Sequence, residues 1–313
     1  MKARNRRLVH GRLAVGIGDQ NERKQAPVAS QRAAGSVTPV GQPDGLFAGY
    51  IFDLDGTIYL GDELLPGAQS LIETLISLDR KILFLSNNPT RSPEDYAAKL
   101  TRLGIPAAEE QVLNTVATMT RWLVRYHPNA TVFPISEAPL KRSLATAGIR
   151  MSDDPSQIDI VIASYDRAFE YRKLQIAFDA IQTYGRARLV TTNPDRFCPL
   201  PGGRGEPDAA AVIGAIEGCT GARCEQNTGK PDPFMLDAAL ERLRLTVSEC
   251  LMVGDRLSTD IRMAIDAGMP SALVLTGETT LKMLLACHPD EHPTWVVERI
   301  DKVLPETVWS GLS

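Results

Sequence analysis

Short apolar runs alternate with longer amphipathic stretches along most of this chain, and several of the apolar runs stop at polar residues. The run at residues 50–52 is followed by Asp53 and Asp55, and the run at residues 81–85 is followed by Ser86. Apolar runs of this length are typical of buried strands, whereas apolar residues that recur every three to four positions are typical of helices. Strands that alternate with helices predict an α/β fold with a mostly parallel sheet and right-handed crossovers.

The same pattern continues to the end of the chain. Capping residues mark several helix starts: Ser92 is expected to cap one helix, and Ser258 or Thr259 another. The glycine-rich segment at residues 199–205 is expected to be a hinge or surface loop, because it lacks the flanking strand and helix of a phosphate-binding loop. The expected strands are 50–53, 81–85, 131–135, 158–163, 187–192, 250–253 and 271–275, the expected helices are 71–78, 93–103, 115–126, 139–147, 172–184, 209–218, 234–243 and 258–267, and 295–297 with 300–303 complete the fold.

Two breaks in the pattern divide the chain into a tail, a core and an insertion. Residues 1–44 carry eight basic and three acidic side chains, a balance of +5, and show no periodicity. We expect a disordered basic tail, with an organellar transit peptide as the second interpretation. The breaker cluster at residues 127–129 indicates that a second α/β unit is inserted into the first. The predicted organisation is a tail at 1–44, a core at 45–126, an inserted cap at 127–224 and the rest of the core at 225–313.

The composition narrows the class of protein. The 313 residues are 43% hydrophobic and 23% charged, which suffices for a sizeable core and roughly two domains. The net charge of −4 and the pI of about 5.7 give no reason to expect nucleic acid as a partner. No apolar run approaches the roughly 20 residues of a membrane-spanning helix, so we expect no membrane association. Five cysteines without a CxxC pair favour a reducing compartment, and we expect a cytoplasmic protein with incidental thiols.

The acidic pair after the first strand constrains the chemistry most. Asp53 and Asp55 are two positions apart, so both side chains point to the same side of an extended chain. Like charges at this distance repel each other unless a cation or a shared proton offsets them. The pair therefore indicates a metal site, a proton donor, or both, although a strand that ends in an acidic Asp-Gly turn carries the same residues.

Other parts of the predicted sheet bring complementary groups to the same edge. A later strand ends at Asp255, and the second strand ends at Ser86 and Asn87. Lys230 precedes a helix. Ligands of parallel sheets bind beyond the carboxyl ends of the strands, so these groups are expected to surround one site. Carboxylates suit Mg²⁺, and an ammonium with backbone N–H groups suits a phosphoryl group in transfer. A carboxylate can also be the nucleophile and form an aspartyl-phosphate.

Four short sequence motifs occur in order in the core, and two further motifs lie in the insertion. They are Asp53-Leu54-Asp55-Gly56-Thr57, Ser86-Asn87-Asn88, Gly229-Lys230-Pro231 and Gly254-Asp255-Arg256 with Asp260, and, in the insertion, Tyr165-Asp166-Arg167 and Thr192-Asn193-Pro194-Asp195. The core motifs resemble those of the haloacid dehalogenase superfamily of phosphatases. The insertion resembles the type IIA cap of the NagD-like subgroup, which includes 4-nitrophenylphosphatase-like, phosphoglycolate and sugar-phosphate phosphatases. The resemblance runs from about residue 46 to the end and implies a Rossmann-like parallel-sheet core with an inserted α/β cap.

The resemblance implies a role for each matching residue. Asp53 would attack phosphorus, and Asp55 would protonate the leaving oxygen and then activate water. Asp53, the backbone carbonyl of Asp55, and Asp255 would bind Mg²⁺. Asp260 would lie behind them and orient Lys230 or a metal-bound water. The residues expected to bind the substrate or its phosphate are Thr57, Ser86, Asn87, Asn88, Lys230, Asn193 and Asp195.

The implied function is a Mg²⁺-dependent phosphatase that hydrolyses small phosphorylated metabolites, such as sugar phosphates or phosphoglycolate, through an aspartyl-phosphate. A receiver-like signalling domain is the second hypothesis, and a sugar-phosphate-binding regulatory protein with little turnover is the third. The resemblance also implies a homodimer joined through the cap. Some residues have a plainer alternative. Lys230 could simply interact with solvent or a helix end, Asp260 could be a helix N-terminal acid, and Asn193 and Asp195 could be ordinary loop residues.

Overall fold

The computed structural model describes residues 41–200 and 204–311. The segment Thr38–Ser313 forms one compact unit. Residues 1–40 of the expected basic tail lie outside the described part of the chain, whereas Gly41 donates a backbone hydrogen bond to the carbonyl of Val296 at 3.3 Å. Within the described residues, no helix is both long and apolar enough to cross a membrane.

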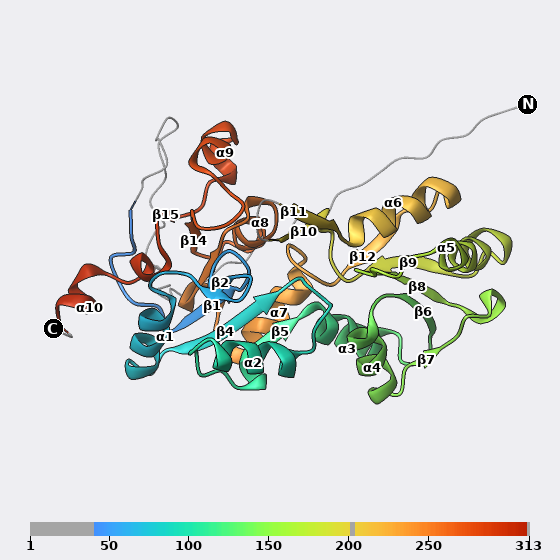
Figure 1. Ribbon diagram of the computed structural model, residues 1–313, viewed down its shortest axis with the longest axis horizontal. Coiled ribbons are helices and arrows are strands. Elements are labelled where there is room, and N and C mark those ends of the chain that lie inside the picture. Colours follow the sequence, from blue (N-terminus) through green and yellow to red (C-terminus); the bar gives the residue numbers. More distant parts are fainter. Residues whose placement is uncertain (1–40, 201–203, 312–313) are drawn as a thin grey trace, which may run out of the picture. The chain divides into compact units, whose positions relative to one another are not determined.

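A six-stranded parallel sheet forms the core (Figure 1). In spatial order its strands are β15 (Trp295–Val297), β14 (Ser271–Val274), β13 (Cys250–Gly254), β1 (Gly49–Asp53), β4 (Lys81–Ser86) and β5 (Val112–Asn114). The chain places β4 and β5 on one side of β1, and then β13, β14 and β15 on the other, so the strand order reverses at β1. Such a reversal opens a crevice at the carboxyl ends of the strands, where ligands bind.

Helices cover both faces of this sheet, α1 (Ala68–Ser77) and α2 (Pro93–Arg102) on one, and α7 (Pro233–Leu243) and α8 (Arg262–Asp266) on the other. Side chains alternate along β1 accordingly: Tyr50 and Phe52 pack with the first pair of helices, and Ile51 packs with the second. A parallel sheet that is buried on both faces requires continuous apolar strands, as the sequence pattern indicated. The predicted α/β fold with a parallel-sheet core is confirmed.

A second, five-stranded parallel sheet lies between β5 and α7 in the chain and forms the cap. In spatial order its strands are β12 (Cys224–Asn227), β9 (Arg188–Thr191), β8 (Ile160–Ala163), β6 (Thr131–Ile135) and β7 (Arg150–Met151), and its helices are α4 (Ala138–Thr146), α5 (Tyr171–Phe178) and α6 (Ala209–Thr220). The predicted insertion of an α/β cap is confirmed. Helix α3 (Thr115–Tyr126) packs with the cap strands, and β12 extends the cap sheet beyond residue 224, while the predicted domain bounds remain a prediction.

Two expectations of local structure are wrong. The segment at residues 199–205, expected as a hinge or loop, falls largely in an antiparallel hairpin of β10 (Phe197–Leu200) and β11 (Arg204–Pro207). Proline and glycine are so frequent there that they hide the strand pattern. The helix expected at residues 258–267 is present as a π-helical turn at Leu257–Ile261 that α8 continues, but Arg256 is its N-cap, so the expected cap at Ser258 or Thr259 is wrong. Further short elements were not expected: the strands β2 (Tyr59–Leu60), β3 (Glu63–Leu64), β5, β7 and β12, and the helices α9 (Leu281–Ala286) and α10 (Glu306–Ser310).

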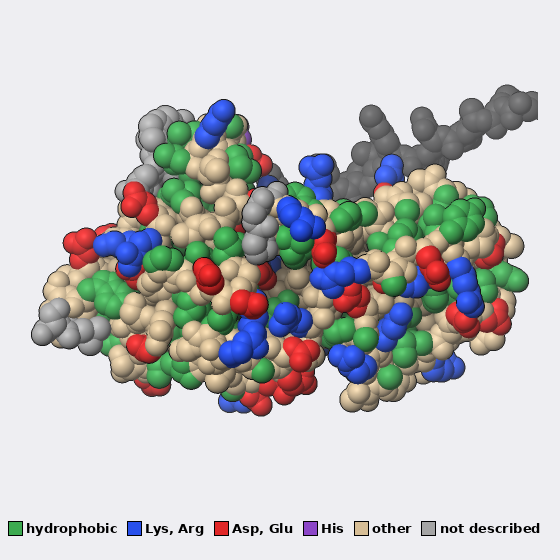
Figure 2. Space-filling view, in the orientation of Figure 1, with side chains coloured by type: hydrophobic (Ala, Val, Ile, Leu, Met, Phe, Trp, Pro, Cys, Tyr) green, Lys and Arg blue, Asp and Glu red, His purple; other side chains and the backbone are tan. Residues whose placement is uncertain are grey.

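Charged side chains of both signs are interspersed over the described part of the face seen in Figure 2. Some surface charges form exposed ion pairs, as Arg262 does with Asp266 at 2.8 Å. Such pairs contribute little to stability because water and salt screen them. The mixture of signs is consistent with the small net charge of the chain.

Candidate active site

Three buried carboxylates gather at the carboxyl end of the core sheet. Asp53 is the last residue of β1, Asp255 follows β13, and Asp260 lies in the π-helical turn after it. One oxygen atom from each carboxylate lies within 4.8 Å of the others. Two glycines permit this approach, because a Cβ atom on Gly254 would overlap Asp260 and a Cβ atom on Gly277 would overlap Asp255. Asp260, which the resemblance placed behind the metal ligands, thus lies in one cluster with Asp53 and Asp255.

Lys230 is the cation within this cluster. Its Nζ atom contacts the carboxylate of Asp53 and lies 2.7 Å from that of Asp260. The residue is only 2% exposed. Burial alone would lower the pKa of Lys230, but the carboxylates of Asp260 and Asp53 outweigh burial and raise it. Lys230 therefore keeps its charge, and the plainer alternative of a solvent-facing lysine is wrong.

The carboxylates carry more negative charge than one ammonium offsets. Burial, together with the charge of Asp260, raises the pKa of Asp53 to about 7, although Lys230 lowers it. Burial and the charges of Asp53 and Asp260 raise the pKa of Asp255 well above its ordinary value. The buried Oδ1 atom of Asp255 also has no hydrogen-bond partner among the described residues. A cation bound by these carboxylate oxygens would offset the excess negative charge and give Oδ1 of Asp255 a partner. The site therefore fits a hard divalent ion such as Mg²⁺.

Asp55 belongs to the same cavity but has a different environment. Its Oδ2 atom accepts a hydrogen bond from the Tyr59 hydroxyl at 3.5 Å. Burial raises the pKa of Asp55, and this effect outweighs the positive charges of Lys99 and Arg256, which lower it. Asp55 is therefore able to hold a proton at a higher pH than an ordinary aspartate.

The end of β4 brings polar side chains into contact with the loop that carries Lys230. Asn87 holds the backbone of Lys230 at two points: its Oδ1 atom accepts from the N–H at 2.8 Å, and its Nδ2 atom donates to the carbonyl at 3.1 Å. The Ser86 hydroxyl accepts a hydrogen bond from the N–H of Asn88 at 3.2 Å and donates one to Tyr96 at 3.4 Å. The second motif and Lys230 thus hold each other in place.

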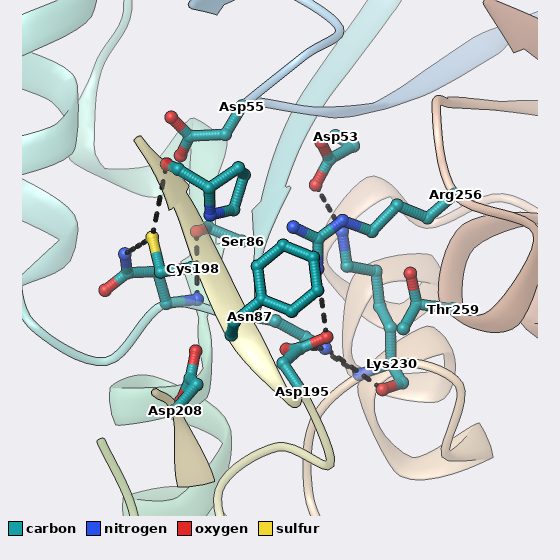
Figure 3. Close-up of a pocket in the computed structure, with 13 residues that line it drawn as sticks. Asp53, Asp55, Ser86, Asn87, Asp195, Cys198, Asp208, Lys230, Arg256 and Thr259 are labelled. Atoms are coloured by element: carbon teal, nitrogen blue, oxygen red, sulfur yellow. Dashed lines mark hydrogen bonds and ion pairs between the residues drawn. The ribbon is translucent and has the colours of Figure 1, made fainter. Parts of the chain in front are cut away.

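Asp53, Asp55 and Lys230 line one cavity together with the end of β4, and the side chains labelled in Figure 3 converge on it. Asp255 and Asp260 adjoin it through Asp53, whereas Thr57 and Asn193 are fully buried and outside its described lining. The predicted residues in the lining are Asp53, Asp55, Ser86, Asn87, Asn88, Asp195 and Lys230, and the lining residues without a predicted role are Phe197, Cys198, Pro199, Asp208, Arg256 and Thr259.

Most of the unpredicted lining residues come from the cap hairpin and from the loop after β13. Cys198, expected as an incidental thiol, accepts a contact from Nδ2 of Asn88 at 3.6 Å, and burial raises its pKa to about 11. Arg256 forms ion pairs with Asp195 and Glu278, both at 3.1 Å. The sequence of the hairpin shows no strand pattern, so its lining residues could not be predicted. Among the lining residues without a predicted role, only Arg256 belongs to one of the four motifs.

Family models match both parts of the core. The model for haloacid dehalogenase-like hydrolases matches residues 50–150. A second model, described as HAD-hydrolase-like, matches residues 227–303. The two matched segments contain the three buried carboxylates, Asp55, the end of β4 and Lys230, so the family match and the observed cavity involve the same residues.

Several known proteins are similar over most of the chain. An acid sugar phosphatase of Staphylococcus haemolyticus is 33% identical over 261 residues, which are 83% of this chain and 96% of the relative. The crystal structure of a 4-nitrophenylphosphatase from Thermotoga maritima is 30% identical, with a TM-score of 0.77 over 82% of this chain and 96% of that chain. A structure described as a putative NagD protein is 29% identical, with a TM-score of 0.74 over 84% of this chain and 98% of that chain.

The chain belongs to the haloacid dehalogenase-like hydrolases, and within them it is a NagD-like phosphatase. The resemblance inferred from the four motifs is confirmed. The receiver-like alternative has no support from these relatives, because each of the three is named as a phosphatase or a NagD protein.

Proposed function

We propose that this protein is a Mg²⁺-dependent phosphatase that hydrolyses small phosphorylated metabolites through an aspartyl-phosphate intermediate. The observation that carries the proposal is the position of Asp53, whose carboxylate contacts Lys230 and shares a buried cluster with Asp255. A nucleophile, a cation for the transferred phosphoryl group and a set of metal ligands therefore meet at one cavity. Relatives named as a sugar phosphatase and a 4-nitrophenylphosphatase support a small monoester as the substrate.

In the first step, a carboxylate oxygen of Asp53 attacks phosphorus, and the bond from phosphorus to the leaving oxygen breaks. Asp55 donates its proton to that oxygen, so the product leaves as a neutral alcohol. The raised pKa of Asp55 supports this role, because the carboxyl group must hold a proton when the substrate arrives. Burial raises the pKa of Asp53, and Lys230 opposes this effect, so the contact with Lys230 favours the ionised, nucleophilic form of Asp53.

In the second step, water hydrolyses the bond between Asp53 and phosphorus. Asp55, now ionised, takes a proton from the water as its oxygen attacks phosphorus. Phosphate leaves, and Asp53 is again a carboxylate while Asp55 is again protonated. Ser86, the backbone N–H of Asn87 and the ammonium of Lys230 hold the phosphoryl oxygens in both steps.

Mg²⁺ would be held by Asp53, the carbonyl of Asp55, and Asp255, and when bound it would offset charge on the phosphate oxygens. Asp260 orients Lys230 from the side opposite the substrate, a role supported by its 2.7 Å ion pair. Asn88 keeps its proposed place among the substrate-binding residues because it lines the cavity. Thr57 and Asn193 lie outside the described lining, so we assign both to the support of the site.

A second cavity of about 330 Å³ adjoins Asp55 and offers room for the leaving group. Leu60 and Phe197 supply apolar surface to it, and Arg204 and Glu278 supply charge. Its volume lies at the lower end of the usual range for small-molecule sites. We therefore propose sugar-sized or aryl leaving groups rather than folded phosphoproteins.

The direct test is turnover of 4-nitrophenyl phosphate, sugar phosphates, phosphoglycolate and nucleotides by the purified protein with and without Mg²⁺. Wild-type protein is expected to turn over at least one metabolite, Asp53→Asn to be inactive, and the exposed-site control Asp237→Asn to match wild type. Absence of wild-type turnover, or full turnover by Asp53→Asn, would refute the proposal. Tight metabolite binding with negligible turnover would favour the regulatory-protein hypothesis, and a long-lived phosphoprotein would favour the receiver hypothesis.

The compartment and the oligomeric state belong to the same proposal. We place the enzyme in the cytoplasm, which is supported by five cysteines that are all free. We also propose a homodimer joined through the cap, where Tyr171 and Tyr184 expose large aromatic side chains. Light scattering after size-exclusion chromatography would test the dimer, and a monomer at micromolar concentration would contradict it.

A further inference from the structure

We propose that Asp195 is a positioning residue that couples closure of the cap to the alignment of Lys230, by holding Asn87 and Arg256 at the same time. The proposal rests on the phosphatase mechanism above. It replaces the expectation that Asp195 binds substrate, although Asp195 lines the cavity. Its basis is the set of hydrogen bonds that the two carboxylate oxygens accept.

Donors from the protein itself occupy both oxygens of Asp195. The Oδ2 atom accepts from Nδ2 of Asn87 at 2.9 Å and from Nδ2 of Asn193 at 3.0 Å. The Oδ1 atom accepts from Nη1 of Arg256 at 3.1 Å. Asn193 belongs to the cap, whereas Asn87 and Arg256 belong to the core, as Figure 3 shows for the two core partners. A buried carboxylate saturated in this way is suited to hold residues in place rather than to bind a ligand.

The bond to Asn87 anchors an amide that holds the backbone of Lys230. Nδ2 of Asn87 has two hydrogens, and they go to Asp195 and to the carbonyl of Lys230. This leaves Oδ1 of Asn87 facing the N–H of Lys230, from which it accepts at 2.8 Å. A carboxylate can only accept, so Asp195 adds a third bond that favours the orientation already matched by the N–H and the carbonyl of Lys230. Loss of Asp195 would leave the amide with its two bonds to Lys230 alone, so this pair would lose its anchor to the cap, and the backbone that carries the ammonium would be less firmly held.

The bond to Arg256 reaches the loop that carries the acidic cluster. The Arg256 guanidinium lies between Asp195 and Glu278, at 3.1 Å from each. Its own backbone N–H donates to Oδ2 of Asp260 at 3.1 Å. Arg256 also directly follows Asp255. One carboxylate of the cap therefore contacts both the residue that clamps Lys230 and the loop that carries two of the clustered acids.

The two contacts form and break together when the cap moves. An open cap would leave Arg256 with one carboxylate partner and Asn87 with an unpaired N–H, and both groups would lose their fixed geometry. A closed cap restores both contacts, so that Lys230 is aligned only when the substrate is enclosed. The alignment of a catalytic group affects the transition state more than it affects substrate binding.

The test uses Asp195→Asn, Arg256→Gln and the double variant, with the exposed cap residue Asp153, which is 72% exposed, changed to Asn as the matched control. We expect Asp195→Asn to lower kcat by about 10- to 100-fold while KM changes by less than about threefold. The double variant is expected to be no more than about threefold worse than the poorer single variant, because both remove one contact. A raised KM at unchanged kcat, or independent effects that multiply, would overturn the proposal.

Hydrogen–deuterium exchange supplies a readout that does not depend on turnover. The backbone amides of residues 87, 88, 193 and 195 are expected to exchange faster in both single variants than in wild type and in Asp153→Asn. Unchanged exchange in both variants would overturn the coupling even if activity falls. Thermal melting shows whether each variant folds. If Asp195→Asn does not fold, the exchange data of Arg256→Gln alone test the coupling. Inactive wild-type protein would refute the phosphatase mechanism, and the exchange data would still report on the contact between cap and core.

Discussion

The carboxylate of Asp260 lies 2.7 Å from the ammonium of Lys230, and neither side chain is appreciably exposed. The same carboxylate accepts the backbone N–H of Arg256 at 3.1 Å. The helix-terminal position of Asp260 in the sequence left two interpretations open, a simple N-terminal acid or a residue that orients Lys230. The ion pair favours the second, because Asp260 contacts the same ammonium that contacts Asp53.

Replacing Asp260 by Asn should weaken both the enzyme and its fold. The change leaves a buried ammonium with one carboxylate partner, which is expected to lower the free energy of unfolding by about 3 kcal/mol and kcat by at least about tenfold. Urea denaturation and steady-state kinetics measure the two effects. Asp266→Asn is the control, because that acid forms a half-exposed pair with Arg262 and should cost less than about 0.5 kcal/mol. Equal effects of the two changes would contradict the orienting role.

Asp53→Asn and Asp55→Asn should both abolish turnover, but Asp55→Asn should still bind phosphate. Asp55→Asn keeps the nucleophile and the contact between Asp53 and Lys230, so it should bind inorganic phosphate within about threefold of wild type while kcat falls by about 10³-fold or more. Isothermal titration with phosphate in the presence of Mg²⁺ measures the binding. Loss of phosphate binding in Asp55→Asn would argue that this residue holds the phosphate rather than its proton.

Gly277→Ala should disturb the proposed metal site without replacing a charged residue. A Cβ atom there would lie 2.7 Å from Cβ of Asp255 and closer still to its carboxylate, so Asp255 must move. Affinity for Mg²⁺, measured by isothermal titration calorimetry, is expected to fall by about tenfold or more. Gly214→Ala in α6 is the control, because no atom lies within 4 Å of its added Cβ, and helix propensity favours Ala there. Unchanged metal affinity in Gly277→Ala would remove Asp255 from the ligand set.

Asp208 should make the folded protein less stable as the pH rises through the range 4 to 6. Burial raises the pKa of Asp208 to about 6, against hydrogen bonds from Asn193 and the N–H of Ala209, which lower it. The ordinary value is about 4, so between these values the folded state binds more protons than the unfolded state and stability falls with rising pH.

Asp208→Asn removes this titration. Relative to wild type, the variant is expected to gain about 1 to 3 kcal/mol of stability between pH 4 and pH 7.5, as measured by urea denaturation at several pH values. The difference between the two proteins isolates Asp208 from the other buried acids. A difference that stays constant with pH would show that Asp208 has an ordinary pKa.

The sequence located the parts of the site whose chemistry is local. β1 and β13 are apolar runs that are closed by carboxylates, so both the strands and their catalytic ends are visible in the chain. Because parallel strands align their carboxyl ends, the meeting of Asp53, Asp255 and the end of β4 followed from topology alone. The structure added the distances between these groups, and it showed that Lys230 is buried among acids.

The remaining features depend on contacts between the cap and the core, which no local pattern encodes. Arg256 and Asp195 are 61 positions apart and meet only because the cap lies over the sheet. β12 (Cys224–Asn227) is an edge strand without an apolar run, so periodicity could not reveal it. The hairpin that carries Cys198 has prolines and glycines where the usual strand pattern would stand. The predictions therefore missed most of the cap residues that line the cavity.

The pairing of β1 with β13 joins Gly49 to Cys250. During synthesis on the ribosome, one edge of β1 therefore has no partner until the whole cap has been translated. An apolar strand with an open edge is prone to pair with other chains. The cap strands, in contrast, come from one continuous segment and can fold before the core is complete. A product truncated within the cap would carry Asp53 without β13 or Asp255, and it would be a source of aggregates rather than of partial activity.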